Sequence, residues 1–266
     1  MTAAGPKHYR TIFLSDIHLG TRGCKAELLL EFLDRHQCDQ LFLVGDIVDG
    51  WRLTRNWYWP GTHNQVLQKF LAMARDGTRV VYIPGNHDEI ARDYHRLTIG
   101  DVVILRDAVF ECADGRKFLV IHGDEFDGVV KYAKWLAYLG DAAYNFALSV
   151  NNGYNLVRRR LGYPYWSLSA YLKLKVKNAV EYIDNFEAAL TEEARRRDLD
   201  GVICGHIHNA EIRDVGGITY CNDGDWVESC TALVEDFDGR MSILRWTSES
   251  AAALPARAGE TRLAAE

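Results

Sequence analysis

The sequence predicts an α/β fold with a parallel sheet, a second sheet packed on it and a helical insertion. Short apolar runs alternate with amphipathic stretches over residues 9–83, which is the pattern of β-α-β units with right-handed crossovers. Short alternating runs separated by glycine turns follow residue 208, whereas residues 126–200 hold no strand candidate. These three observations together define the predicted class.

The parallel sheet is predicted from its apolar runs. Leu41–Val44 is short and bounded by turn residues, as expected of a buried parallel strand. We expect the other strands over Tyr9–Ser15, Arg79–Ile83, Lys117–Ile121 and Gly201–Cys204, and helices over Lys25–His36 and Gln65–Arg75.

The C-terminal part predicts the second sheet. Period-two alternation predicts strands over Glu211–Val215, Gly217–Cys221, Cys230–Asp236 and Arg240–Trp246. We expect these strands to form an antiparallel sheet. Residues 248–266, rich in alanine with scattered charge, predict a disordered tail, so the predicted domain covers residues 9–247.

A helical insertion is predicted within this domain at residues 126–198. Apolar residues at steps of three and four over 129–150 predict one amphipathic helix, and a second is expected over Ser167–Arg197. Residues 131–177 are rich in tyrosine and tryptophan, and they include eight basic residues but only one acidic residue, Asp141. Such a lid would attract an anionic substrate and suit acyl chains or a membrane interface. A dimer contact or a structural role is the alternative.

Composition excludes several classes of protein. The net charge of −6 argues against a nucleic-acid binder, despite the basic insertion. The six cysteines are scattered without a C-x-x-C pair, which favours buried thiols in a reducing compartment. No apolar segment resembles a signal peptide or reaches the roughly 18 residues of a membrane span. We therefore expect a cytoplasmic location, with peripheral contact at the inner face of the inner membrane left open.

Five apolar runs end in Asp, Asn or His, usually beside a glycine. The carboxyl ends of strands are where open α/β sheets bind ligands. The ligand candidates at these ends are Asp16, His18, Asp46, Asn86, His122, His206 and His208. One such motif alone is more often a surface accident or a turn, but five in this order predict a metal site.

The residue types predict which metals bind. Carboxylate, amide and imidazole groups together suit manganese, iron or zinc. Seven ligands are too many for one tetrahedral zinc, but they fit two octahedral ions that share a carboxylate. Asp16 and His18 are two residues apart, which on an extended segment would place both side chains on one side. The same spacing relates His206 to His208.

This set of motifs resembles the calcineurin-like metallophosphoesterase superfamily. The superfamily pattern is D-x-H, G-D-x-x-D, G-N-H-D/E, H-G and G-H-x-H, and every element occurs between residues 13 and 208. The resemblance implies a two-sheet β-sandwich flanked by helices, and a metal-dependent hydrolase. It also implies one metal held by Asp16, His18, Asp46 and His208, and another held by Asp46, Asn86, His122 and His206.

The resemblance implies a catalytic group beside the metals. Two cations about 3.5–4 Å apart activate a water and clamp the phosphoryl oxygens. His87, next to Asn86, is the expected acid for the leaving oxygen, with Asp49 fixing its tautomer. The alternative role of Asp49 is that of a plain turn carboxylate. Manganese is the first choice of metal, with iron and zinc as alternatives.

The sequence G-D-x-x-D-G-W and the insertion resemble the branch of UDP-2,3-diacylglucosamine pyrophosphatases in lipid A synthesis. This resemblance implies hydrolysis of a lipid-linked pyrophosphate, with substrate contacts from Trp51, Arg158, Lys173, Lys177 and Asn178. The sequence departs from the branch at His87, where the branch has Arg, and at Asn209, where it has an Arg-Pro pair. A phosphodiesterase or nucleotide hydrolase with a soluble substrate therefore stays an alternative. No nucleic-acid partner is expected, and the oligomeric state is open.

Overall fold

The structure is a computed structural model of the chain, and it describes residues 6–129 and 168–247, with side chains described over 6–126 and 182–247. The chain forms two compact units. The core unit comprises residues 1–124 and 193–266, and the insertion unit comprises residues 125–192. The first predicted insertion helix, apart from its first residue, and the whole of the predicted tail lie outside the described residues.

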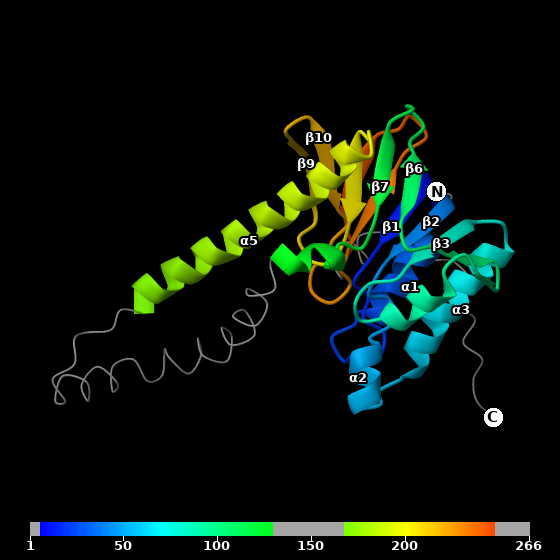
Figure 1. Cartoon of the computed structure of the whole chain (residues 1–266). Helices are drawn as coiled ribbons and strands as arrows, with labels where there is room; N and C mark the ends of the chain where they lie inside the picture. Colours follow the sequence, from blue (N-terminus) through cyan, green and yellow to red (C-terminus); the bar gives the residue numbers. More distant parts are fainter. Residues whose placement is uncertain (1–5, 130–167, 248–266) are drawn as a thin grey trace, which may run out of the picture. The chain divides into compact units, whose positions relative to one another are not determined.

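The core unit is built on a seven-stranded sheet (Figure 1). Its order is β12 (Met241–Arg245), β11 (Thr231–Glu235), β1 (Lys7–Leu14), β2 (His36–Val44), β3 (Arg79–Ile83), β5 (Val102–Ile104) and β4 (Thr98–Ile99). The central strands β1, β2 and β3 are parallel, as predicted, and β5 continues the parallel arrangement next to β3. The short strands β4 and β5 are absent from the prediction.

A five-stranded sheet packs on the first. Its order is β6 (Ala108–Glu111), β7 (Lys117–Val120), β8 (Gly201–Cys204), β10 (Ile218–Asn222) and β9 (Glu211–Val215). The prediction of an all-antiparallel second sheet is wrong, because β7, β8 and β10 are parallel neighbours. The hairpin of β11 and β12 instead pairs with β1 of the first sheet. Every residue of β11 is buried, which suits an inner strand of the larger sheet.

Helices flank the sheets. The core unit contains α1 (Ala26–Arg35), α2 (Gly50–Arg55), α3 (Gly61–Arg75) and the 3₁₀ helix η1 (Glu89–Tyr94). Two more helices, η2 (Asp124–Val129) and α5 (Leu168–Arg196), lie mostly in the insertion unit. The predicted ranges of α1 and α5 agree closely with the structure, whereas α2 is absent from the prediction. Among the helices of the described residues, none is long and apolar enough to cross a bilayer.

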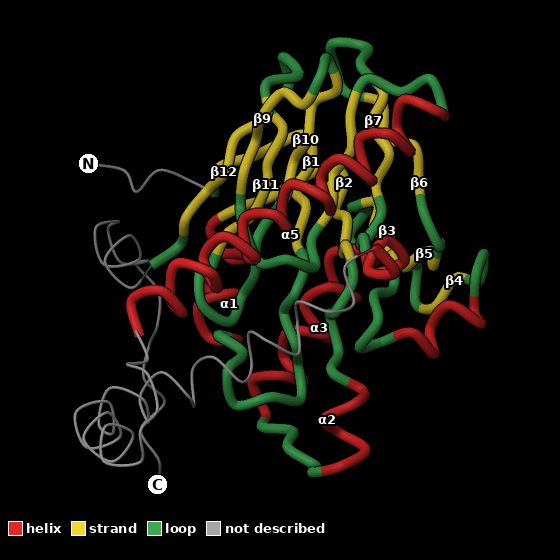
Figure 2. Tube along the Cα trace, turned by 60° about the vertical axis from the view of Figure 1, so that its left-hand side comes forward, coloured by secondary structure: helices red, strands yellow, loops and turns green. Residues whose placement is uncertain are grey.

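Alternating residues of β1 contribute to the two halves of the core. Ile12 and Leu14 belong to the cluster that includes α1 and α3, whereas Phe13 belongs to the cluster between the two sheets. Phe13 stacks on Phe42 of β2 at 5.1 Å and meets Phe110 of β6 edge-on at 5.1 Å. Successive side chains of a strand point to opposite faces. The core unit therefore layers helices, a large sheet and a smaller sheet (Figure 2), as the resemblance implied.

Candidate metal centre

The loops that follow β1 and β2 are tied together by backbone hydrogen bonds. The amide of Asp16 donates to the carbonyl of Gly45 at 3.0 Å, and the amide of His18 donates to the carbonyl of Asp46 at 2.9 Å. The other predicted ligands follow β3, β7 and β8 in the same way, two residues or more beyond the last strand residue. The carboxyl ends of strands from both sheets thus supply the candidate site.

Five of the predicted ligands have left-handed backbone conformations. The φ angles are 49° at Asp16, 52° at His18, 54° at Asp46, 73° at His206 and 55° at His208. A non-glycine residue in this region costs of order 1–3 kcal/mol and persists only where its surroundings enforce it. The extended geometry predicted for Asp16 and His18, and for His206 and His208, is therefore wrong. Tight turns with left-handed residues, rather than the period-two alternation of a strand, direct these side chains toward the candidate site.

Each glycine of three motifs lies against a predicted ligand. A Cβ atom on Gly45 would lie 2.2 Å from Nδ1 of His122, and one on Gly85 would lie 2.3 Å from Oδ1 of Asp46. On Gly205 it would lie 2.5 Å from Oδ2 of Asp16. Real Cβ contacts are essentially never this short. The glycines in the G-D, G-N and G-H motifs therefore make room for the side chains of neighbouring loops.

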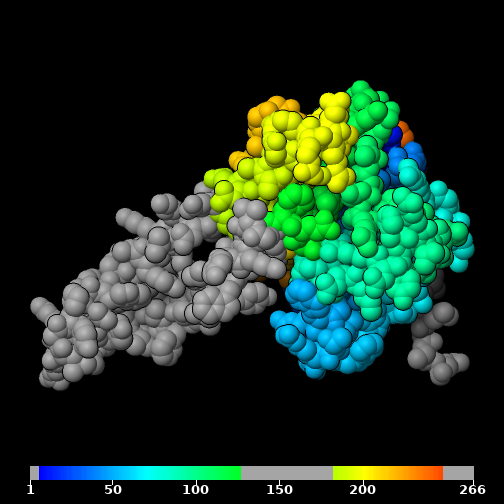
Figure 3. Space-filling model, viewed as in Figure 1, coloured from blue at the N-terminus to red at the C-terminus, as the bar shows by residue number. Residues whose placement is uncertain are grey.

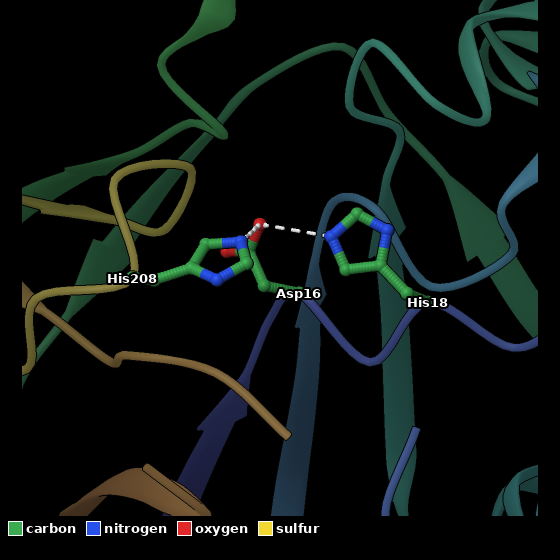
Figure 4. A group of neighbouring side chains, drawn as sticks. All are labelled: Asp16, His18 and His208. Carbon is green, nitrogen blue, oxygen red and sulfur yellow. Dashed lines mark ion pairs between the residues drawn. The ribbon is translucent and has the colours of Figure 1, made fainter. Parts of the chain in front are cut away.

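Among the described residues, two of the three groups that could hold a metal consist of predicted ligands only, and the first of these two clusters is Asp16, His18 and His208 (Figure 4). Oδ1 of Asp16 lies 3.0 Å from Nε2 of His208 and 3.8 Å from Nε2 of His18. Asp16 comes from the end of β1 and His208 from the loop after β8, so the two sheets meet at this carboxylate. Its Oδ2 accepts hydrogen bonds from the hydroxyl of Ser15 and the amide of His206, both at 2.7 Å.

The second cluster consists of Asp46, His122 and His206, all buried. Nε2 of His122 lies 3.4 Å from Oδ1 of Asp46. Nδ1 of His122 lies 2.8 Å from the carbonyl oxygen of Val44, to which it donates when it carries the proton. This contact favours the tautomer whose Nε2 is free to act as a ligand.

Asp46 lies between the two clusters. Its Oδ1 faces His122 of the second cluster, and its Oδ2 lies 3.8 Å from Nε2 of His18 in the first. The amide of His87 donates to Oδ1 at 2.9 Å. One carboxylate thus presents one oxygen to each cluster, which is the arrangement of a bridging ligand.

Unsatisfied polar atoms test whether cations fit these clusters. Nε2 of His122 and Oδ1 of Asn86 are buried and make no hydrogen bond within the described part of the chain. A buried polar atom without a partner costs about 1–3 kcal/mol. The donor set of imidazole, carboxylate and amide is that of borderline divalent metals. The residues present therefore fit two divalent cations.

The electrostatics of both clusters favour positive charge. Burial lowers the pKa of His18, but hydrogen bonds to Asp16 and Asp49 outweigh it and raise the pKa to about 10. Burial likewise lowers the pKa of His122, and the charge of Asp46 raises it to about 10. Burial raises the pKa of Asp46, yet His122 brings it down to about 2. A bound cation would take the place of these protons.

Asp49 connects two imidazoles at the edge of the first cluster. Its Oδ2 lies 3.3 Å from Nδ1 of His18, and its Oδ1 lies 3.0 Å from Nδ1 of His87. Oδ1 also accepts the amide of Arg52 at 2.8 Å, which caps α2. Burial raises the pKa of Asp49, but the hydrogen bonds with His18 and His87 hold it well below its usual value. Asp49 thus contacts both imidazoles in addition to capping α2, and its role beside His87 stays a prediction.

Three supporting residues are absent from the predicted site. The carboxylate of Asp88 accepts the amides of Gly85 at 2.6 Å and Ile47 at 2.7 Å, which holds the β2 and β3 loops together. Oδ1 of Asp223 lies 2.5 Å from the hydroxyl of Ser15, and Nδ2 of Asn222 donates to the carbonyl of Gly205 at 2.7 Å. Asn222 and Asp223 end the apolar strand β10 beside Gly224. An apolar strand that ends in Asp or Asn beside a glycine is the same pattern that identified the other five segments.

The predicted substrate contacts are only partly described. Trp51 is 46% exposed, and its ring centroid lies 4.4 Å from that of His87. Lys173, Lys177 and Asn178 are part of α5, but their side chains lie outside the described ones. Arg158 lies outside the described residues altogether.

Comparisons with known proteins identify a matching family, relatives and solved structures. The family model described as calcineurin-like phosphoesterase matches residues 9–210. A UDP-2,3-diacylglucosamine hydrolase of Porphyromonas gingivalis is 27% identical over 249 residues, covering 84% of this chain and 93% of the relative. The protein of the same name from Photorhabdus laumondii is 23% identical, covering 77% and 84%. Among solved structures, the phosphoesterase Yfce of E. coli is 13% identical with a TM-score of 0.42, covering 89% of this chain and 99% of its own.

Proposed function

The chain belongs to the calcineurin-like phosphoesterase family, a family of metal-dependent hydrolases, and we propose that it cleaves the pyrophosphate of UDP-2,3-diacylglucosamine or a related lipid-linked substrate. The observation that carries this proposal is the position of Asp46, with one carboxylate oxygen toward each cluster. The name shared by the relatives supports the choice of substrate. A soluble phosphodiester or nucleotide is the second candidate, favoured by His87 and Asn209, where the sequence departs from the pyrophosphatase branch.

The two clusters would hold two divalent cations, manganese as the first choice and iron or zinc as alternatives. Asp16, His18, Asp46 and His208 would bind one, and Asp46, Asn86, His122 and His206 the other. When bound, the cations lower the pKa of a water and neutralise charge on the phosphoryl oxygens. The protein holds the ligands in place through contacts such as His122 to Val44 and Ser15 to Asp16.

His87 is the proposed catalytic side chain. Its Nδ1 lies 3.0 Å from Asp49, and its Nε2 lies 3.9 Å from Oδ2 of Asp46. Nδ1 faces Asp49, so Nε2 is the nitrogen next to the shared carboxylate. When both ring nitrogens carry a proton, Nε2 would donate a proton or a hydrogen bond to the departing phosphate oxygen as the water oxygen bonds to phosphorus and the bridging P–O bond breaks, and the proton that the water loses passes to solvent. Asn86, the adjacent residue, would orient a phosphoryl oxygen as well as bind metal.

Trp51 and the insertion would bind the rest of the substrate. The ring of Trp51 covers one side of His87 and is 46% exposed, so it offers a flat face to a sugar, a base or an acyl chain. The basic residues Arg158, Lys173 and Lys177, together with Asn178, would attract the anionic head group from the insertion.

Hydrolysis assays on the purified full chain test this function. The metal-free protein, prepared with a chelator, is reconstituted with Mn²⁺, Fe²⁺ or Zn²⁺ and assayed on UDP-2,3-diacylglucosamine, a chromogenic phosphodiester, cyclic nucleotides and single-stranded DNA. The proposal predicts UMP and the acylated sugar phosphate as products, with the highest kcat/KM on the lipid substrate. A higher kcat/KM on a soluble phosphodiester would support the second candidate instead.

A further inference from the structure

Two tryptophans near the candidate metal centre are exposed to solvent. Trp57, in the turn after α2, is 74% exposed, and Trp51, on α2, is 46% exposed. The turn itself is anchored, because the rings of Tyr58 and Trp59 each lie 5.7 Å from the ring of His63. His63 is buried and accepts the amide of Gly20 at 3.0 Å. The exposure of Trp57 is thus a property of an ordered turn.

The segment that carries these tryptophans has basic but no acidic side chains, and the nearest acid before it is Asp49, which caps α2. From Gly50 to Arg75 the sequence contains no Asp or Glu. Arg22, Arg52 and Arg55 are exposed, and within the described part of the chain none of their guanidinium groups pairs with an acid. The guanidinium of Arg22 lies over the ring of Tyr58, 4.6 Å from its centroid. We call Arg22, Trp51, Arg52, Arg55 and Trp57 the α2 surface.

The α2 surface adjoins the candidate metal centre. In Figures 1 and 2, α2 projects from the core unit beyond the carboxyl end of β2. In Figure 3 the corresponding light-blue surface forms one extremity of that unit. The side chain of Leu53 packs on Gly20, where a Cβ atom would lie 2.8 Å from it, and Trp51 packs on His87. The inner side of α2 therefore contacts His87 and the loop that follows His18, while its arginines and the neighbouring Trp57 are exposed.

Exposed tryptophan next to unpaired arginine matches the chemistry of a lipid headgroup region. Tryptophan rings are enriched at the membrane–water interface, and basic groups are attracted to anionic headgroups. A nucleic acid is a poorer fit because the chain carries a net charge of −6. The α2 helix has six residues, so it can lie on a bilayer but cannot span it.

We propose that the α2 surface docks the protein on the anionic surface of a lipid bilayer. The proposal rests on the proposed function in one respect: a membrane-borne substrate gives the docking its purpose, since the α2 surface borders the metal centre through Trp51. Docking itself depends only on the tryptophans and arginines. Trp57 enters the headgroup layer, and Arg52 and Arg55 contact lipid phosphates.

Vesicle co-sedimentation of the full chain tests the proposal. The probe is vesicles of phosphatidylglycerol and phosphatidylethanolamine, compared with vesicles of phosphatidylcholine alone. Trp57→Ala should weaken binding to the anionic vesicles on the order of tenfold, because a large ring loses its buried area. The double variant Arg52→Gln with Arg55→Gln should weaken it about 25-fold, about fivefold for each charge. Salt should weaken wild-type binding, since the Debye length is about 8 Å at physiological ionic strength.

Matched variants elsewhere on the core unit serve as controls. Phe237 is 59% exposed in the turn between β11 and β12, so Phe237→Ala removes an exposed ring away from α2. Arg240 is 71% exposed and lies 3.1 Å from Asp236, so Arg240→Gln removes an arginine that already has a partner. Both controls should bind anionic vesicles as the wild type does. Equal losses in the controls and the α2 variants would contradict the proposal.

The remaining outcomes separate docking from catalysis. Unchanged vesicle binding in the α2 variants, equal binding to phosphatidylcholine, or no binding by the wild type would overturn the docking proposal. A wild-type dimer that dissociates on Trp57→Ala would assign the surface to a second copy of the chain and overturn it as well. Hydrolysis of the lipid substrate in detergent micelles, where no bilayer exists, reports on the proposed function alone. The α2 variants should keep that activity.

Discussion

The two clusters of the candidate metal centre use similar residues but differ in their access to solvent. Each combines one carboxylate with two imidazoles. In the first cluster the side chain of His208 is 35% exposed and that of His18 is 11% exposed. In the second, the side chain of His122 is 1% exposed and His206 is buried. The first cluster is therefore open and the second closed.

The difference follows from the elements that surround each cluster. His122 is enclosed by the glycine loops after β2 and β3, where Gly45 and Gly85 leave no space for a Cβ atom. The open cluster instead borders Asp49, His87 and Trp51, which are the groups suited to proton donation and substrate contact. The comparison therefore separates the two clusters by access, with an open site that solvent and substrate reach directly and a closed site that they do not reach through His122.

Asp46→Asn should have the largest effect, because this carboxylate is shared by both clusters. The amide keeps the size of the side chain but loses the charge and one ligand oxygen. We expect both cations to bind weakly and hydrolysis to fall below detection, while the fold is retained. Metal analysis and circular dichroism on the variant provide the measurement. Full activity in Asp46→Asn would refute a shared ligand.

His87→Ala should lower kcat by about 10²–10⁴-fold, the range typical of general acids and charge-stabilising side chains. His87 lies beside the open cluster but is not among its proposed ligands, so both metals should stay bound. Elemental analysis of the purified variant is the decisive control. Loss of one metal equivalent would mark His87 as a ligand rather than a proton donor.

Asp49→Asn and Asp49→Ala should separate two roles of one carboxylate. Asn caps a helix about as well as Asp, whereas Ala costs typically about 1 kcal/mol at this position. Both variants lose the charge that orients His18 and His87, so we expect kcat to fall about 10–100-fold in each. Only Asp49→Ala should also lower the midpoint of thermal unfolding. Equal activity in Asp49→Asn and the wild type would show that Asp49 only caps α2.

The ligand set could be predicted because each member follows an apolar strand directly in the sequence. The directions of these side chains could not be predicted from the sequence. Asp16 and His18 adopt left-handed backbone conformations that depend on hydrogen bonds to the distant residues Gly45 and Asp46. Asp223 directly follows the apolar strand β10 and precedes Gly224, so the same sequence pattern could have predicted it as a site residue.

The sequence also could not predict which of the two sheets each C-terminal strand joins. Strand β10 is apolar and followed by a turn, like β11, yet β10 pairs with β8 and β11 with β1. Strand β8 lies close to β10 in the sequence, whereas β1 lies at the other end of the chain from β11, and hydrophobic alternation along a strand does not choose between such partners. The closed second cluster depends on this choice, because β7 and β8 supply His122 and His206 from the smaller sheet.

The smallest effect concerns the order in which the two metals leave. A chelator needs access to a ligand atom, and the closed cluster offers none through His122, whose side chain is 1% exposed. We expect a chelator to remove one metal equivalent at least several times faster than the other, with activity lost in the fast phase.

His208→Ala should remove the fast phase and leave one slowly exchanging metal. His122→Ala, which deletes a ligand of the closed cluster, is the matched variant and should remove the slow phase. Two metals lost at one rate in the wild type would mean that both clusters open together, and the division into an open and a closed site would not hold.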